Sequence, residues 1–167
     1  MTNGDPIDPM TFRKVLGTYP TGVTLVSACD QDGPFAMVIG SFGSVSLDPP
    51  LVQFMPAVDS ATWARIEPTG SYCVNVLGDD QLGLSSSFFA KERDPFDAVD
   101  WRPGPTGSPV IEGCVAWIDC DIEAVHPAGD HLIVVGAVKA MGQGSSAAGP
   151  LLFLGGAYGR YEPLAGD

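Results

Sequence analysis

Extended segments joined by turns dominate this sequence, and this pattern most limits the fold it can adopt. Apolar residues alternate in segments such as 71–77 (SYCVNVL) and 114–125 (CVAWIDCDIEAV), and turn sequences such as DQDG separate such segments. About seven of them occur, and they follow one another through turns rather than through crossover helices. We therefore expect a mainly β fold, an antiparallel barrel rather than a doubly wound parallel sheet.

Two short segments carry helix signals. Asp8 can cap a helix that has Pro9 at its first position. This helix would carry an apolar stripe with the spacing i, i+3, i+4, i+7, made of Phe12, Val15, Leu16 and Tyr19. The stripe predicts that the helix covers one opening or flank of the barrel. Asp59 or Ser60 can cap a second, short helix over residues 62–66.

The charge of the chain restricts its partners. Its 167 residues include 20 Asp and Glu against 8 Lys and Arg, which gives a formal net charge of -12. Nucleic acid requires a basic face, so we expect no nucleic-acid partner. An anionic ligand would have to be bound by local donors, namely backbone N–H groups, hydroxyls and one or two placed cations.

Length and hydropathy favour a single domain over residues 1–167. No apolar run approaches the roughly 20 residues of a membrane span, so we expect no membrane partner. The start, MTNGDPIDPM, lacks the basic and apolar parts of a secretion signal. A cytoplasmic location is the resulting expectation.

The cysteines and histidines do not have metal-site spacing. None of the four cysteines (Cys29, Cys73, Cys114 and Cys120) belongs to a CxxC pair, and the chain has two histidines. We therefore expect no metal site. Cys114 and Cys120 are in phase on one predicted strand, where they would be small core residues.

Residues 38–46 (VIGSFGSVS) gather hydroxyl groups and glycines ahead of a rigid LDPP turn. Gly40 and Gly43 would let another group approach the backbone closely. The hydroxyls belong to Ser41, Ser44 and Ser46. The segment indicates a binding site for a small polar ligand, and the alternative is an irregular edge strand.

Three further stretches are candidates for the same site, each with an ordinary alternative. Ser60 and Thr62 stand at a predicted helix start, where they would bind a phosphate or only cap the helix. His131 enters a strand after a tight turn and would bond a substrate amide or carbonyl, or would be an exposed turn residue. Tyr158, Arg160 and Tyr161 stand beside glycines, where they would stack on a planar ligand or form the rim of a terminal strand.

Taken together and in order, these stretches resemble the short-chain flavin reductases, the reductase components of two-component flavin-dependent monooxygenases. The resemblance covers about residues 9–161 and rests on the elements YPTGVT, SVSLDPP and PAGDH. It implies an antiparallel split β-barrel with an N-terminal helix and short flanking helices, and a homodimer. It also implies reduction of FMN or FAD by NADH or NADPH, with reduced flavin passed to a partner monooxygenase.

Two other functions stay open at this point. The same barrel would also serve a flavin-binding redox sensor or carrier that does not turn over free flavin. A related split barrel oxidises pyridoxamine phosphate, which would call for a more basic phosphate site than a net charge of -12 suggests.

The resemblance also implies roles for individual residues. It places the flavin ring and ribityl chain against Val38, Ile39, Gly40 and Ser41 and against Ser44, Val45 and Ser46. It places the phosphate side near Ser60, Ala61 and Thr62 and near Phe89, Ala90 and Lys91. It implies that His131 is the catalytic position, at the nicotinamide, and that Tyr158 lies beside the cofactor.

The chain departs from the family pattern before the SF pair. Many members have Thr-Ala-Asn or Thr-Ala-Ser where this chain has Val38, Ile39 and Gly40, and many have Thr where it has Gly43. Backbone N–H groups would have to replace the missing side chains. Hydride transfer to a flavin is a positioning task. The lack of a nucleophilic triad in the sequence is therefore consistent with this chemistry.

Overall fold

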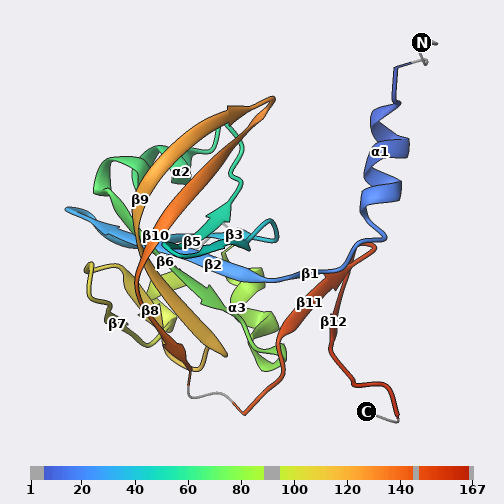
Figure 1. Cartoon of the computed structure of the whole chain (residues 1–167). Coiled ribbons are helices and arrows are strands. Elements are labelled where there is room, and N and C mark those ends of the chain that lie inside the picture. The colour runs from blue at the N-terminus through green and yellow to red at the C-terminus, as the bar shows by residue number, and fades with distance from the viewer. Residues whose placement is uncertain (1–5, 89–94, 145–146, 166–167) are drawn as a thin grey trace.

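Seven antiparallel strands form the central sheet of the protein, shown in Figure 1 as a computed structural model that describes residues 6–88, 95–144 and 147–165. They are β2 (Thr24–Asp30), β3 (Gly33–Ile39), β4 (Gly43–Leu47), β5 (Pro50–Phe54), β6 (Ser71–Val76), β9 (Ala116–Ala128) and β10 (His131–Gln143). Their order is β3-β2-β6-β9-β10-β5-β4. Within the described residues β3 and β4 are the two edges of this sheet, so the barrel is split there. The expected mainly β, split-barrel fold is confirmed.

Two smaller sheets complete the β structure. One contains β1 (Thr21–Gly22), β11 (Leu151–Leu154) and β12 (Ala157–Arg160) in the order β1-β11-β12. The other pairs β7 (Trp101–Pro103) with β8 (Pro109–Ile111).

The C-terminal segment forms two strands, not the single terminal strand expected from the sequence. It is a hairpin, in which β11 and β12 pair antiparallel. Gly155 and Gly156 have φ values of 60° and 86°. Because two successive positive φ angles suit a tight hairpin turn and glycine adopts them without a steric penalty, this pair turns the chain back on itself.

The helices are short: α1 (Pro9–Leu16), α2 (Ala61–Ile66) and α3 (Leu82–Ser87), with 3-10 turns at Glu67–Thr69, Asp79–Gln81 and Pro95–Ala98. Both predicted caps are present. The Asp8 carboxylate accepts a hydrogen bond from the Thr11 N–H at 2.9 Å. The Ser60 hydroxyl accepts one from the Trp63 N–H at 3.2 Å.

Helix α1 does not cover the barrel, so that expectation was wrong. All of its residues are exposed, and it stands beside the sheet rather than on it (Figure 1). The reason lies in how the helix is attached. The Gly17 carbonyl accepts a hydrogen bond from the Gly155 N–H at 2.9 Å, which ties the end of the helix to the β11–β12 turn. The helix is thus anchored to the small C-terminal sheet and not to the main one.

Two apolar clusters form the core, and β2 contributes to both. Val26 belongs to the cluster that contains Phe54, Trp63 and Tyr72. Leu25, its neighbour, belongs to the cluster that contains Leu77, Phe96, Ile111 and Leu151. Because side chains alternate across a strand, a strand buried on both faces reads as a continuous apolar run. In the first cluster the Phe54 ring packs edge-on against Trp63 and Tyr72, with ring centroids 5.9 and 5.0 Å apart.

A buried polar cluster attaches the β7–β8 hairpin to the main sheet. Asn75 is fully buried, donates to the Ser27 hydroxyl at 2.9 Å and accepts from the Ile111 N–H at 2.8 Å. The Ser27 hydroxyl donates to the Pro109 carbonyl at 2.6 Å. Buried polar groups with partners on both sides fix one arrangement of the chain, because an unpaired group there is costly.

Three cysteines lie in the interior as core residues. Cys73, Cys114 and Cys120 are buried and free, and burial raises the pKa of the Cys120 thiol to about 12. Cys114 precedes β9 instead of lying on it, which corrects its placement on the same strand as Cys120.

Candidate functional site

A small apolar pocket lies where the main sheet meets the C-terminal sheet. Its volume is about 260 Å³. Its walls come from three separate parts of the chain: Thr21, Gly22, Val23, Val38, Ile39, Gly40, Phe153 and Tyr158. The pairing of Thr21 with Phe153 in the β1–β11 ladder brings two of these parts together. The third is the end of β3, which reaches the pocket from the edge of the main sheet.

Gly40 lies close to Thr21 in the wall of this pocket. A Cβ atom at this position would lie 3.0 Å from the Thr21 hydroxyl oxygen. A side chain here would therefore crowd the opposite wall, and glycine keeps the backbone of β3 accessible to a ligand.

A second hollow of about 300 Å³ adjoins the first, and Tyr158 borders both. Its walls are more polar and consist of Asp79, Leu82, Leu151, Tyr158, Gly159 and Arg160. The Tyr158 ring packs edge-on against Phe153 with centroids 5.2 Å apart. Its hydroxyl lies 3.4 Å from the hydroxyl of Ser85, which is fully buried. These two contacts hold the ring between the two hollows.

The structure brings together four residues that the family resemblance assigned to the flavin, namely Val38, Ile39, Gly40 and Tyr158. Ser41, the next residue, is engaged elsewhere. Its hydroxyl accepts a hydrogen bond from the Met55 N–H at 2.9 Å and donates to the Met55 carbonyl at 3.2 Å. Ser41 thereby links the end of β3 to the end of β5.

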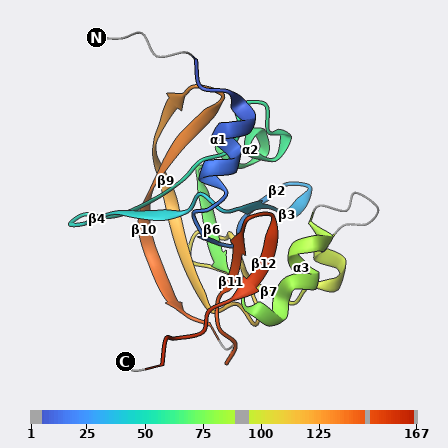
Figure 2. The same cartoon turned by 90° about the vertical axis from the view of Figure 1, so that its right-hand side faces the viewer.

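Ser44, Val45 and Ser46 lie on β4, outside the walls of the pocket. The register shifts between Ser44, opposite Val52, and Ser46, opposite Leu51, so Val45 is the extra residue of a β-bulge. In Figure 2 this strand extends away from the body of the protein. The role of these three residues toward flavin stays a prediction.

His131, at the start of β10, lies beside the segment that leads into Ser60, Ala61 and Thr62. Ala57 forms an isolated bridge with His131, and the Val58 N–H donates to the Asp130 carbonyl at 3.0 Å. The tip of the β9–β10 hairpin therefore lies beside the chain that leads into α2. None of these four residues lines the pocket at Tyr158. Phe89, Ala90 and Lys91 lie outside the described residues.

His131 is paired with its neighbour. Its Nδ1 lies 2.7 Å from the Asp130 carboxylate, and this hydrogen bond lowers the pKa of Asp130. The pair fixes the orientation of an imidazole whose side chain is half exposed. A ring held in this way is suited to bond a ligand with its other nitrogen.

Several wall residues were not among the candidates expected from the sequence. They are Thr21, Gly22, Val23 and Phe153 of the apolar pocket and Asp79 and Leu82 of the polar hollow. A signal for Thr21, Gly22 and Val23 was present, because all three belong to the YPTGVT element that carries the family resemblance. Phe153 has no such signal, since only the β1–β11 pairing brings it to the site.

Comparison with known proteins decides the family. A family model described as "Flavin reductase like domain" matches residues 16–162. The chain belongs to the flavin reductase family. It is 52% identical over 159 residues to a flavin reductase of Pseudomonas putida, with 95% of this chain and 93% of the relative covered. It is 46% identical over 158 residues to the reductase subunit HsaB of a flavin-dependent monooxygenase of Mycobacterium tuberculosis, with 94% and 84% covered.

A solved structure agrees with this assignment. The NADH:FAD oxidoreductase SgcE6 of Streptomyces globisporus C-1027, in complex with NAD and FAD fragments, superposes with a TM-score of 0.87 at 36% identity. The match covers 97% of this chain and 99% of that one.

The flavin reductase is therefore an NAD(P)H-dependent enzyme that reduces flavin and supplies it to a partner monooxygenase, as the resemblance implied. Its cofactors are a flavin and a nicotinamide nucleotide. In the part of the chain that the structure describes, no three His, Cys, Asp or Glu side chains converge to hold a metal ion. No helix in that part has the length and apolar character needed to cross a membrane.

Proposed function

We propose that the flavin ring binds in the pocket between β1, β3 and β12, with Tyr158 beside it. The observation that carries this proposal is the convergence of Thr21, Val38, Gly40 and Tyr158, from three separate stretches of the family pattern, around one apolar pocket. Its volume of about 260 Å³, with the polar hollow of about 300 Å³ next to it, lies near the lower end of the range for small-molecule sites. An apolar wall with accessible backbone and the two aromatic rings of Phe153 and Tyr158 suits a flat heteroaromatic ligand.

The residues of the protein have a positioning task in this reaction. Bound flavin supplies the hydride-accepting chemistry. Tyr158, held by Phe153 and Ser85, orients the ring in its pocket. Val38 and Gly40 offer backbone groups in place of the side chains that many members have, and they keep water from one face.

The nicotinamide is expected on the side of His131. The Asp130 carboxylate holds the Nδ1 of His131, and this contact also sets the direction of Nε2 on the same ring. We expect it to bond the carboxamide of the nucleotide. Because His131 does not line the pocket at Tyr158, its effect on flavin affinity should be small.

We further propose that the enzyme is a homodimer. Large apolar side chains are exposed on α1, on the C-terminal sheet and directly after it, among them Phe12, Val15, Tyr158 and Tyr161. Patches of this kind usually mark an interface, and most oligomers are symmetric. A cytoplasmic location, the choice between FMN and FAD, and the choice between NADH and NADPH stay predictions for direct assay.

The decisive experiment compares two tyrosines of the same segment. Tyr158→Ala should weaken flavin binding roughly tenfold, as expected for one stacked aromatic ring. Tyr161→Ala is the matched control, because Tyr161 is exposed and does not line the pocket. Flavin affinity is measured by quenching of flavin fluorescence. Equal flavin affinities for the two variants would contradict the proposal that the flavin ring binds in this pocket.

Turnover is tested with both nucleotides and both flavins. Steady oxidation of the nucleotide with excess free flavin is expected of a reductase, whereas a flavin carrier or sensor would react once and stop. His131→Ala should raise the KM for the nucleotide about 5–150-fold, the effect of losing one positioned hydrogen bond. Its flavin affinity should remain unchanged. Stopped-flow traces identical to those of the wild type would make His131 a turn residue only.

A further inference from the structure

The N-terminal arm, residues 6–20, is an amphipathic segment that buries none of its large side chains in its own chain. Its helix α1 is well formed, since Asp8 caps it and Gly17 ends it. Its stripe nevertheless lies open: the exposed fractions are 54% for Phe12, 59% for Val15, 52% for Leu16 and 71% for Tyr19.

This exposure is difficult to reconcile with an isolated subunit. A helix of eight residues is marginal in water by itself. In proteins such a helix is stabilised chiefly by packing of its apolar face. The stripe on α1 therefore requires cover from outside its own barrel.

The arm also carries positive charge that no carboxylate neutralises at close range. Of the Lys and Arg side chains that the structure describes, Arg65, Arg102, Lys139 and Arg160 each form an ion pair with a carboxylate. Arg13 and Lys14, both on α1, form no ion pair within the described residues. Arg13 acts only at longer range, where its charge lowers the pKa of Asp130.

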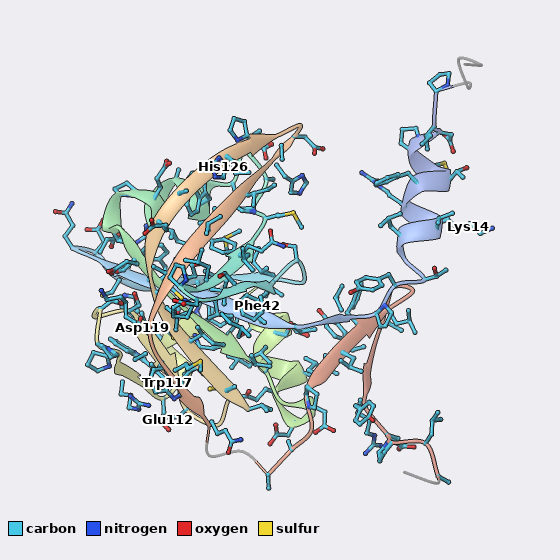
Figure 3. All side chains as sticks on the ribbon, viewed as in Figure 1. Lys14, Phe42, Glu112, Trp117, Asp119 and His126 are labelled. Atoms are coloured by element: carbon cyan, nitrogen blue, oxygen red, sulfur yellow. The ribbon has the colours of Figure 1, made fainter. Side chains whose placement is uncertain are left out.

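The rest of the chain is strongly acidic, since the net charge is -12 even with these two cations included. Figure 3 shows Lys14 pointing away from the barrel of its own chain. An apolar stripe flanked by unpaired cations is thus complementary to an acidic surface, and a second copy of this chain provides one.

The arm leads directly into a wall of the flavin pocket. Tyr19 and Pro20 are followed by Thr21 and Gly22, which line that pocket. The Gly17 carbonyl is bonded to the turn of the β11–β12 hairpin, which supplies Phe153 and Tyr158. A contact that fixes the position of the arm therefore also fixes two of the three walls of the flavin pocket, namely β1 and the β11–β12 hairpin.

We propose that the arm of each subunit packs its Phe12–Val15–Leu16 stripe on a second copy of the chain, and that this contact fixes the β1 wall of the flavin pocket. In a two-fold dimer the contact is made twice, once by each arm. This inference rests on the proposed homodimer and pocket. It adds the element that forms the dimer and the connection from that element to flavin binding.

The test is a double substitution, Phe12→Glu with Val15→Glu, in the full chain. Met10→Glu is the matched control. Met10 is 79% exposed on the same helix but lies about 200° around the helix from Phe12, away from the stripe. Sedimentation velocity is run from 1 to 50 µM, flavin affinity is measured on the same samples, and circular dichroism reports the fold.

The expected results separate the two effects of the arm. The wild type and Met10→Glu should sediment as dimers. The double variant should sediment as a folded monomer, because the stripe has no partner in its own chain, and its flavin affinity should fall roughly tenfold. Arg13→Glu with Lys14→Glu should weaken the dimer more at low salt than at high salt, because its ion pairs are screened.

Four results would overturn the proposal. These are a monomeric wild type, a double variant that remains a dimer, a monomeric double variant with wild-type flavin affinity, and a double variant that loses only coupling to the monooxygenase. The last would mean that the arm binds the partner enzyme instead. Failure of the proposed function would look different, since a wild-type dimer without flavin turnover would leave the arm contact intact.

Discussion

Helices α1 and α2 begin from the same sequence signals and end in opposite environments. Each has a polar N-cap, Asp8 or Ser60, followed by apolar residues at helical spacing. The shorter α2 buries Trp63 and Ile66, with 3% and 0% exposed, whereas the longer α1 buries nothing.

The difference comes from how each helix is connected. Strands β5 and β6 of the main sheet flank α2 in the chain, so the chain has to bring α2 back onto the core. Helix α1 is followed in the chain by β1, which pairs with β11 of the small sheet, and the end of the helix is bonded to the β11–β12 turn. An amphipathic pattern therefore predicts that a helix face will be covered, but the connections decide whether its own chain covers it.

The largest expected contrast is between aromatic residues on the two helices. Trp63→Ala should lower the free energy of unfolding by about 3–5 kcal/mol, because it leaves a cavity beside Phe54. Phe12→Ala should change it by less than about 0.5 kcal/mol in the dissociated subunit, the usual size for an exposed position. Urea unfolding at low protein concentration measures both. Similar losses at the two positions would mean that α1 packs on its own barrel in solution.

The cap of α2 should have a smaller but measurable effect. Ser60→Ala should cost about 1 kcal/mol, the usual loss for a helix cap, and Ser60→Asp should restore it. We expect flavin affinity to be unchanged in Ser60→Asp, because the hydroxyl already has a partner in the Trp63 N–H. A clear fall in flavin affinity in Ser60→Asp would instead support the phosphate role that the family resemblance assigned to Ser60.

The ion pair between Arg65 of α2 and Asp30 should make the free energy of unfolding depend on pH. The cations of α1 form no such pair within the described residues. Arg65 donates to both carboxylate oxygens of Asp30 at 2.8–2.9 Å and holds the pKa of Asp30 below its usual 3.8. The folded pKa is lower than the unfolded one, so the pair stabilises the fold above about pH 4 and this contribution is lost as the pH falls through the folded pKa.

Because the side chains of the pair are 44% and 23% exposed and are partly screened by solvent, this contribution is modest. Urea unfolding between pH 5 and pH 2.5 should show a shallower loss of stability for Asp30→Asn than for the wild type. Parallel profiles for the two proteins would mean that the pair adds nothing to stability.

The smallest effect is expected at the cap of α1. The Thr11 N–H lowers the pKa of the Asp8 carboxyl, so the cap is lost on acidification or in Asp8→Ala. In the Phe12→Glu, Val15→Glu background, Asp8→Ala should speed amide exchange within residues 9–16 and leave the global unfolding midpoint unchanged. A shifted midpoint would show that α1 and the barrel unfold together.

Several parts of the protein were predictable from local pattern and from the family elements. The strands around β2 and β3, the two helix caps and the buried Cys114 and Cys120 follow from alternation, cap chemistry and hydropathy. The family elements placed Val38, Gly40 and Tyr158 at a flavin, and the structure brings these three residues together. The Gly155–Gly156 turn was missed, although two glycines between apolar runs are a hairpin signal that could have indicated it.

The sequence by itself therefore determined which segments are strands or capped helices, because periodicity and capping act over only a few residues. Only the tertiary structure decided that Thr21, Gly40 and Phe153 form one pocket, because long-range strand pairing brings such distant segments together. It alone also showed that the stripe of α1 is left open. Burial depends on where the connections carry a helix, and no local pattern contains that information.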